Sequence, residues 1–327
     1  MNILVIRFSA LGDVVMTVPV IHSIATCYPQ HHFIVLSRTG MTSYFENLPS
    51  NVQFKGVDLN QYKGIGGLGR LYQELKRLDI DAVADLHDVL RSQYLRLRFL
   101  LAGKKVCHIQ KGRAERKALT SGNPGKHQQL KTSFERYADV FAELGLPVSV
   151  SYIPSKISNP GWIGIAPFAA HAGKVYPHEK MKEVIRRISQ HADTRIFLFG
   201  GGAREVEMLE SWAQIAPNVE SVAGKLDRKE ELKLISELKV MLSMDSANMH
   251  LASLMGTEVV SVWGATHPYA GFLGWNQKLE NAIQVDLPCR PCSIYGNKPC
   301  SKGDYPCLNT ISPEDIAHKV LSVAFDD

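Results

Sequence analysis

This sequence has no long apolar run. Its apolar stretches stay well short of the roughly 20 residues that a membrane-spanning helix requires. The apolar opening, residues 2–8, is interrupted by Arg7, and no small-residue cleavage site of a signal peptide follows it. We therefore interpret the opening as a buried strand and expect a cytoplasmic protein with no transmembrane segment.

Cysteine is scarce and unevenly placed. Of the six cysteines, Cys27 and Cys107 are isolated and are interpreted as small buried hydrophobic residues. The others share one proline-rich segment that opens with C-x-x-C: Cys289, Cys292, Cys300 and Cys307. Four thiolates can hold a structural zinc ion, whereas the irregular spacing favours reduced thiols in an ordered loop. Both interpretations stay open, disulfides are disfavoured in the cytoplasm, and no metal ligand is assigned.

The length predicts two domains. A chain of 327 residues exceeds the size of about 250–300 residues at which single cores stop growing. A hydrophobic content of 45% and a charged content of 21% are those of a globular protein. Residues 147–161 contain three prolines and four serines, which is typical of a linker. We predict domains at 1–155 and 156–312, with a last helix at 313–323 that can pack back on the first domain.

Both halves alternate short apolar runs with amphipathic stretches, which predicts parallel sheets with helical crossovers. Strands are expected at 2–8, 33–37, 52–57, 82–85 and 105–109, and again at 162–167, 195–200, 240–244 and 258–263. Helices are expected at 14–28, 68–78, 91–102 and 132–144, and again at 179–191, 204–216, 228–238 and 247–255. The prediction is an α/β protein of two Rossmann-like, doubly wound domains that face each other across a ligand-binding cleft.

The positive charge is concentrated in the first half. Residues 1–158 contain 20 lysines and arginines against 12 acidic residues, and residues 159–327 contain 17 against 20. Within 91–131, eleven basic residues accompany a single acid, Glu115. Such a field raises the local concentration of an anionic ligand: nucleic acid, an acidic membrane surface, or a phosphorylated or carboxylated glycolipid. A solvated basic face without a ligand is the alternative.

The first loop, SALGDVV, directly follows the first strand. Gly12 permits a sharp turn, and Asp13 then stands at the start of a helix. Asp13 is interpreted either as a helix N-cap or as a general base at the mouth of the cleft.

A second strand-to-helix junction, SMDSANMHLASLMG, contains Asp245, Ser246 and His250. Backbone N–H groups at the start of a helix attract phosphate, although Asp245 and Ser246 can also be simple caps. The strand end with Gly201 permits close approach of a ligand or of another backbone segment. Lys174, in a loop before a helix, can neutralise a diphosphate or be an ordinary surface lysine.

The stretch Gly64-Ile-Gly-Gly-Leu-Gly69 fits the dinucleotide-binding pattern literally, but a polar segment precedes it instead of a strand. We interpret it as a loop entering a helix. A nicotinamide-dependent oxidoreductase is therefore disfavoured.

Three motifs together resemble glycosyltransferase family 9, the ADP-heptose:lipopolysaccharide heptosyltransferases. They are the opening NILVIRFSALGDVVMTVPVIHSI, the stretch GKVYP, and MDSANMHLASLMGTEVVSVWGATHP. A cysteine-rich tail followed by ISPEDI is also similar to some members. Two departures stand out, because Ala247-Asn248 replaces the usual Gly-Leu and His267 stands where an acidic residue is common.

The resemblance implies a GT-B fold and an inverting glycosyltransferase, with the acceptor in the first domain and the nucleotide sugar in the second. Asp13 would be the general base, and Lys174 would pair with the donor phosphates. Asp245 would hold the sugar or the diphosphate, Ser246 and Ala247 would present backbone N–H groups, and His250 would support the loop. Gly201 is added to the donor site. Acceptor-binding candidates are Gly12 and four residues of the basic run, Arg113, Arg116, Lys117 and Lys126.

The implied partners are an ADP-sugar and an anionic glycolipid of the lipid A–Kdo type at the membrane surface, with no nucleic acid, no cofactor and no required metal. A peripheral position at the inner face of the inner membrane follows. Two alternatives stay open: a non-catalytic nucleotide- or glycan-binding protein of the same fold, and a family member that uses another nucleotide sugar.

Overall fold

The computed structural model describes residues 1–122 and 127–325. These residues form two compact units. Unit 1 comprises residues 1–111 and 133–152, and unit 2 comprises residues 112–132 and 153–327. The later boundary, between Tyr152 and Ile153, lies in the proline- and serine-containing linker predicted from the sequence.

Unit 1 is built on a parallel sheet of five strands in the order β3-β2-β1-β4-β5. The strands are β1 (Asn2–Ile6), β2 (His32–Arg38), β3 (Val52–Val57), β4 (Ala82–Asp85) and β5 (Lys105–His108). The helices are α1 (Leu11–Val15), α2 (Thr17–Cys27), α3 (Gly64–Lys76), α4 (Leu90–Leu101) and α6 (Ser133–Glu143). A 3-10 helix, η1 (Thr39–Phe45), follows β2.

Helices cover both faces of this sheet, which is why its central strands are apolar without alternation. Residues 3–6 of β1 and 33–37 of β2 are all buried. On one face Leu4 and Ile6 pack with Leu71 of α3 and Leu95 of α4. On the other face α2 and α6 pack together. The predicted parallel α/β architecture is confirmed for this unit.

Unit 2 repeats the architecture with a parallel six-stranded sheet in the order β11-β10-β9-β6-β7-β8. Its strands are β6 (Asn159–Ala166), β7 (Arg195–Leu198), β8 (Val219–Ser221), β9 (Leu238–Met244), β10 (Glu258–Val262) and β11 (Ala282–Ile283). Its helices are α5 (Arg113–Leu119), α7 (His178–Ser189), α8 (Ala203–Trp212), α9 (Arg228–Glu237), α10 (Ala247–Leu254), α11 (Pro306–Asn309) and α12 (Pro313–Phe325). The second predicted parallel sheet is thus also confirmed.

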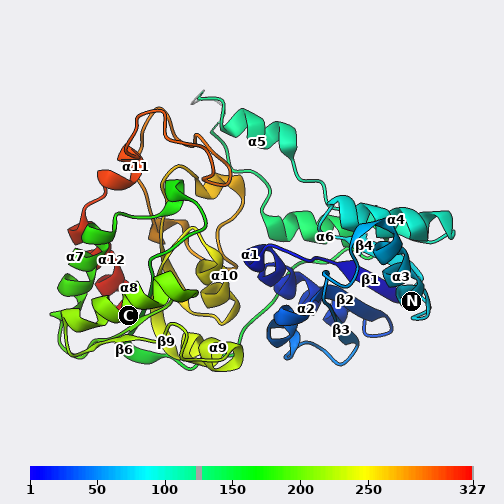
Figure 1. Ribbon diagram of the computed structural model, residues 1–327, viewed down its shortest axis with the longest axis horizontal. Coiled ribbons are helices and arrows are strands. Elements are labelled where there is room, and N and C mark those ends of the chain that lie inside the picture. Colours follow the sequence, from blue (N-terminus) through cyan, green and yellow to red (C-terminus); the bar gives the residue numbers. More distant parts are fainter. Residues whose placement is uncertain (123–126, 326–327) are drawn as a thin grey trace. The chain divides into compact units, whose positions relative to one another are not determined.

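The last helix packs inside unit 2, which differs from the prediction that it returns to the first domain. Helix α12 lies beside α7 (Figure 1) and contacts β6 and β9. Ile316 and Val320 of α12 are fully buried in the same core as Val184 and Ile188 of α7. The apolar stripe of α12 therefore completes one face of its own sheet.

The basic run 91–131 is divided between the two units instead of lying in one. Residues up to Lys111 belong to unit 1, whereas residues 112–132, with α5, group with unit 2. The attachment is apolar and aromatic: Leu119 is fully buried, and the Arg116 guanidinium lies over the Phe272 ring at 4.8 Å from its centroid. The backbone N–H of Leu130 also donates to the carbonyl of Tyr269 at 2.9 Å.

Two further predictions concern the glycine-rich stretch and membrane-spanning helices. The Gly64–Gly69 stretch, predicted as a loop entering a helix, already forms the first turns of α3. Among the described residues, no helix is long and apolar enough to cross a membrane.

Candidate functional site

The order of strands reverses at one point in each sheet. In unit 1 this point lies between β1 and β4, and in unit 2 it lies between β6 and β9. Doubly wound sheets bind ligands outside the carboxyl ends of the strands at such a point. The residues that follow these four strands are therefore the first place to look for a site.

At the reversal in unit 1, Asp13 forms an ion pair with Arg7. The guanidinium Nη2 of Arg7 lies 2.7 Å from Oδ2 of Asp13, and its Nη1 donates to the Leu86 carbonyl after β4 at 2.6 Å. The hydroxyl of Tyr137 donates to the carbonyl of Asp13 at 3.3 Å. Arg7 is buried, whereas the side chain of Asp13 is 31% exposed. The carboxylate is thus held in place yet accessible.

Asp13 is not the N-cap of its helix, which corrects the simpler of the two sequence interpretations. The N-cap of α1 is Ala10, and Asp13 is the third residue of the helix. Its Oδ2 accepts a hydrogen bond from the backbone N–H of Ala10 at 3.3 Å. Gly12 lies in the same short helix, where its carbonyl accepts from the backbone N–H of Met16. Both contacts of the Asp13 carboxylate with described residues use Oδ2.

Basic residues follow four neighbouring strands at this edge of the sheet. Arg38 ends β2, Arg7 follows β1, His87 follows β4, and Lys111 follows β5. Arg38 is exposed, and the Nζ of Lys111 donates to the Asp88 carbonyl at 2.9 Å. Sequence reasoning missed this set because its members are up to 104 residues apart, from Arg7 to Lys111, and only the sheet aligns them. A basic residue at or shortly after the end of four of the five parallel strands was the available signal.

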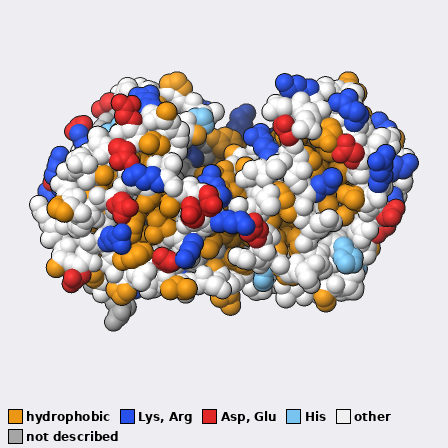
Figure 2. Space-filling model, turned by 60° about the horizontal axis from the view of Figure 1, so that its bottom comes forward, with side chains coloured by type: hydrophobic (Ala, Val, Ile, Leu, Met, Phe, Trp, Pro, Cys, Tyr) orange, Lys and Arg blue, Asp and Glu red, His pale blue; other side chains and the backbone are white. Residues whose placement is uncertain are grey.

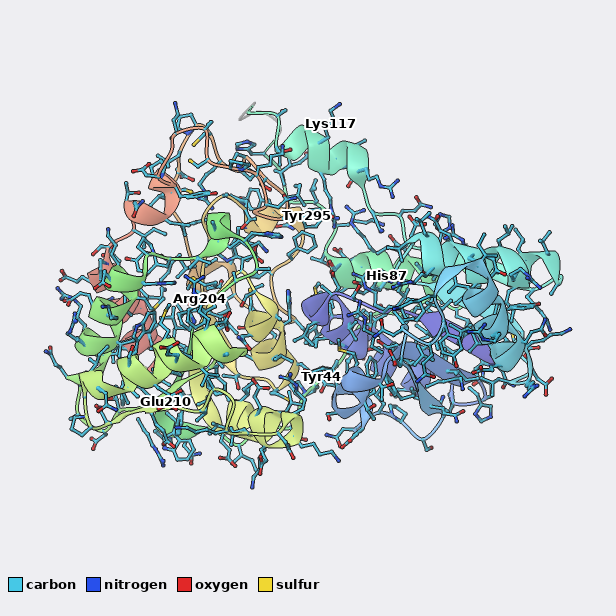
Figure 3. All side chains as sticks on the ribbon, viewed as in Figure 1. Tyr44, His87, Lys117, Arg204, Glu210 and Tyr295 are labelled. Atoms are coloured by element: carbon cyan, nitrogen blue, oxygen red, sulfur yellow. The ribbon has the colours of Figure 1, made fainter. Side chains whose placement is uncertain are left out.

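His87 is uncharged at neutral pH. Burial, together with the nearby charges of Arg7 and Lys111, lowers the pKa of His87 to about 3. Its Nδ1 accepts the backbone N–H of Phe8 at 3.4 Å, so the remaining ring proton belongs on Nε2. The residue is labelled in Figure 3.

We expect His87 to make the protein less stable in acid. Above about pH 6.5, the ordinary histidine pKa, the His87 imidazole is neutral in both the folded and the unfolded chain. Below about pH 6.5 the imidazole binds a proton in the unfolded chain but stays neutral in the folded chain. The free energy of unfolding should fall by about 2 kcal/mol between pH 7 and pH 5 on this account. Urea unfolding of His87→Gln should show that much less acid sensitivity, while the exposed His32→Gln should behave as wild type. Equal acid sensitivity in both variants would contradict the assignment.

At the reversal in unit 2, Lys174 and Asp245 meet across β6 and β9. Lys174 ends a 3-10 turn, η3 (Ala172–Lys174), after β6, and Asp245 directly follows β9. The Nζ of Lys174 lies 2.9 Å from Oδ2 of Asp245, and the hydroxyl of Thr266 donates to the same oxygen at 2.8 Å. Asp245 is 3% exposed. The structure therefore brings together two predicted residues and adds Thr266, which lies in the GATHP stretch.

Close backbone packing sets the position of Lys174. The backbone N–H of Ala265 donates to the carbonyl of Gly173 at 2.8 Å. A side chain at position 296 would come within 2.6 Å of Cγ of Lys174, so Gly296 leaves room for the aliphatic stem of the lysine. The loop after β6 is thus tied to the loop after β10.

Arg290 is a further organising residue that sequence reasoning missed. It is buried, its Nε contacts the Gly264 carbonyl, and its Nη2 donates to the Thr266 carbonyl at 2.9 Å. The neighbouring His267 accepts the backbone N–H of Tyr269 with its Nδ1 at 3.1 Å. Burial and the Arg290 charge lower the pKa of His267 to about 4, so this histidine is neutral too.

The remaining donor-site candidates lie near the same edge. Ser246 is the N-cap residue of α10, with no side-chain capping bond, and Ala247 is the first residue of the helix. His250 is buried in α10. Gly201 follows β7, and its backbone N–H donates to Oε2 of Glu205 at 2.9 Å. Open space surrounds the position where Gly201 would carry a side chain, so ligand approach is sterically free there.

Three of the four predicted acceptor residues of the basic run lie on α5, in unit 2 and not in the unit that contains Asp13. Besides the Phe272 ring, Arg116 contacts Tyr295, whose hydroxyl lies 3.0 Å from its Nη1. Arg116 therefore anchors α5 through its side chain, whereas Arg113 and Lys117 are exposed. Lys126 lies outside the described residues. Over the face in Figure 2, basic and acidic side chains are interspersed.

The four cysteines of the tail are free thiols in this structure. Burial raises the pKa of Cys307 to about 11 and also raises that of Cys292. Among residues 1–122 and 127–325, no three His, Cys, Asp or Glu side chains are grouped so as to hold a metal ion.

The sequence model of glycosyltransferase family 9 (heptosyltransferase) matches residues 68–301, which is more than half of the chain. This range includes Lys174, Asp245 and Arg290 but not Asp13. The chain is 23% identical over 325 residues to lipooligosaccharide heptosyltransferase 2 of Campylobacter jejuni, covering 96% of this chain and 95% of the relative. It is 24% identical to lipopolysaccharide core heptosyltransferase OpsX of Haemophilus influenzae, covering 82% and 80% respectively.

Solved structures of similar fold cover the whole chain. A glycosyl transferase family 9 protein of Veillonella parvula matches with a TM-score of 0.76 at 17% identity, covering 100% of this chain and 98% of that one. ADP-heptose lps heptosyltransferase II of E. coli matches with a TM-score of 0.73 at 18% identity, covering 99% and 98%. At these identities the likeness concerns the fold, which is the two-sheet α/β fold described above.

Proposed function

This chain belongs to glycosyltransferase family 9 and is a glycosyltransferase, and from that premise we propose that it transfers a heptose from ADP-heptose to the inner core of a lipopolysaccharide. The relatives named above are heptosyltransferases of lipopolysaccharide or lipooligosaccharide, which supports the sugar and the acceptor class. The proposed acceptor is an anionic glycolipid at the cytoplasmic face of the membrane.

The observation that carries the proposal is the pair of strand reversals. Each of them has, at its carboxyl edge, the residue that the reaction requires. Unit 1 offers the accessible carboxylate of Asp13, and unit 2 offers the ammonium of Lys174. A base for the acceptor and a cation for the donor phosphates are the two groups needed by a transfer without a metal ion.

In the proposed reaction, the acceptor hydroxyl attacks the anomeric carbon of the heptose from the face opposite the diphosphate. A carbon–oxygen bond to the acceptor forms while the bond to the phosphate oxygen breaks, and the electron pair leaves with ADP. The acceptor proton moves to Asp13. Arg7 and Ala10 hold Oδ2 of this carboxylate, which leaves Oδ1 to receive the proton. The configuration at the anomeric carbon is inverted.

On the donor side we assign the residues slightly different tasks from those that the family resemblance implied. Asp245 is buried and shares its Oδ2 between Lys174 and Thr266, so it positions the lysine instead of contacting the sugar. Lys174 then approaches the diphosphate, whose charge develops further as the bond breaks. The backbone N–H groups that follow Ser246 at the start of α10 receive phosphate oxygens, with Gly201 and His250 near the same edge.

On the acceptor side, two groups of cations are candidates for the anionic groups of the glycolipid. The first is the strand-end pair of Arg38 and Lys111, which shares an edge with Asp13 and with the neutral His87. The second comprises Arg113 and Lys117 on α5, as predicted from the sequence, together with Lys126. Gly12, beside Asp13, is the uncharged acceptor-binding candidate. Arg116 is assigned to anchoring α5.

The function is tested by incubating the full chain with ADP-heptose and a Kdo-bearing lipid A acceptor and measuring ADP release. We expect release only when both are present, because Asp13 needs an acceptor hydroxyl to deprotonate. UDP- and GDP-sugars are tested in place of ADP-heptose as alternative donors. Turnover with one of those would replace heptose by another sugar, and binding of ADP without any turnover would leave a non-catalytic nucleotide-binding protein.

A further inference from the structure

One helix of unit 1 exposes far more apolar surface than its neighbours. Helix α4 has the sequence LRSQYLRLRFLL, and four of its leucines face solvent. Leu90 is 84% exposed, Leu101 75%, Leu100 53% and Leu97 52%. Single exposed leucines are ordinary on protein surfaces, but four on one helix of three turns are a concentration of apolar surface of the kind that marks an interaction site.

The exposed leucines lie on the side of α4 opposite its core-facing residues. At 100° per residue, Leu90, Leu97 and Leu101 fall within about 40° of one another around the helix axis. The core-facing Leu95 and Phe99, which are buried against the sheet, fall on the far side of the helix. A surface helix normally has one apolar stripe and one polar face. Helix α4 has two apolar stripes, and only one of them is covered by unit 1.

A second element extends the patch. Helix α3 packs against α4, and the hydroxyl of Tyr94 lies 3.5 Å from where Gly69 would carry a side chain. Ile65, which is 76% exposed, lies one turn before Gly69 on the same face of α3. Gly69 thus leaves room for the Tyr94 hydroxyl beside it.

The charged residues on α4 itself have one sign. Helix α4 contains three arginines and no acidic residue, and Lys104 follows its end. Arg91 is exposed, and the Arg98 guanidinium is held beside the patch over the Tyr72 ring at 4.6 Å. Arg96 lies on the inner side, where it pairs with Asp85 and Asp88. Leucines rimmed by cations are the composition of a helix that lies in the headgroup region of an anionic bilayer.

We propose that the outward face of α4, with Leu90, Leu97, Leu100, Leu101, Arg91 and Lys104, docks this protein onto an anionic lipid bilayer. A second copy of the chain fits this face less well, because a two-fold contact would set the arginines of one α4 against those of the other with no carboxylate on the helix to offset them. An apolar protein partner would not require the cations.

The position of α4 links the docking surface to the site in unit 1. The helix begins just after β4, at the edge of the sheet where Asp13 and Arg7 lie, and runs roughly 17 Å toward the opposite edge. Figure 1 shows it on the outside of unit 1. A protein that rests on this face presents the proposed base close to the surface in which a lipid-linked acceptor is embedded. The bilayer contact itself does not rest on the proposed transferase activity.

The test is cosedimentation of the full chain with vesicles of phosphatidylcholine alone and of phosphatidylcholine with phosphatidylglycerol. We expect binding to the anionic vesicles that is at least tenfold tighter and that weakens with salt. Leu97→Gln with Leu101→Gln should lose about tenfold or more, because the apolar contribution is removed. Arg91→Glu with Lys104→Glu should lose binding to anionic vesicles only. The matched control is Ile153→Gln with Ile157→Gln, two exposed apolar residues outside unit 1, which should bind as wild type.

Three results would overturn the proposal. The wild-type chain binds neither vesicle; the leucine pair binds as wild type; or the wild-type chain is a dimer that the leucine pair turns into a monomer, which makes this face a self-interface. Transferase activity is measured separately from vesicle binding, as turnover of a lipid-free acceptor. The α4 variants should match wild type there, and an absence of turnover in all proteins would bear on the proposed function without affecting the vesicle result.

Discussion

Replacing Asp13 with asparagine is expected to lower kcat by about a hundredfold or more, the range for loss of a positioned general base. Asparagine keeps the size of the side chain and a carbonyl oxygen that can still accept from Ala10, but it cannot take up the acceptor proton. The affinity for ADP should stay near the wild-type value, because Lys174 and Asp245 belong to the other unit. The measurement is ADP release at saturating donor and acceptor, together with the dissociation constant of ADP.

The control for this variant is Asp81→Asn, a conservative change at the opposite edge of the same sheet, where Asp81 accepts the backbone N–H of Asn2. It should turn over as wild type. Because Asp13 is also the carboxylate partner of the buried Arg7, the melting temperature of Asp13→Asn must be compared as well. A folded variant with wild-type kcat would place the base elsewhere.

Replacing Lys174 with methionine is expected to weaken ADP binding at least tenfold and to slow transfer as well. The ammonium interacts with the diphosphate in both the ground state and the transition state, so both constants respond. Methionine keeps the aliphatic stem that passes over Gly296 and removes only the charge. The measurements are the dissociation constant of ADP and the kcat of the variant.

The same substitution should also destabilise unit 2, because it leaves the Asp245 carboxylate buried without its cation. Breaking a buried ion pair from one side costs about 3–5 kcal/mol. The double variant Lys174→Met with Asp245→Asn should recover much of that stability while ADP stays weakly bound. Recovery of ADP binding in the double variant would show that the single variant failed through its fold, and Lys174 would then have no part in binding the diphosphate.

The positions of several site residues could be predicted from the sequence, whereas their contacts could not. Local signals determined the elements: apolar runs mark both parallel sheets, and the proline- and serine-containing stretch marks the later boundary between the units. Asp13, Lys174 and Asp245 were each predicted from a loop that follows a strand, since such loops lie at the carboxyl edge of a parallel sheet. The contact between Lys174 and Asp245 was not predicted.

The segment 112–132 shows what local pattern cannot decide. Its basic residues predicted a place in the first domain by chain position alone, but its attachment depends on Phe272 and Tyr295, which lie more than 150 residues further along. The position of the last helix could not be predicted for the same reason. Its apolar stripe could cover an exposed face of either sheet, and only the packing against α7 places it on the sheet of unit 2.

Strand order decided the rest of the site. The cations Arg7, Arg38 and Lys111 follow three different strands, and nothing within a single strand announces its neighbours. The same holds for Thr266 and Arg290, which reach Asp245 and the loop after β10 only through the folded sheet. The sequence by itself determined which side chains stand at strand ends, because the strands follow from local periodicity. The tertiary structure alone decided which of these side chains meet. The reason is that parallel strands are joined by crossover connections whose sequence does not specify which strand pairs with which.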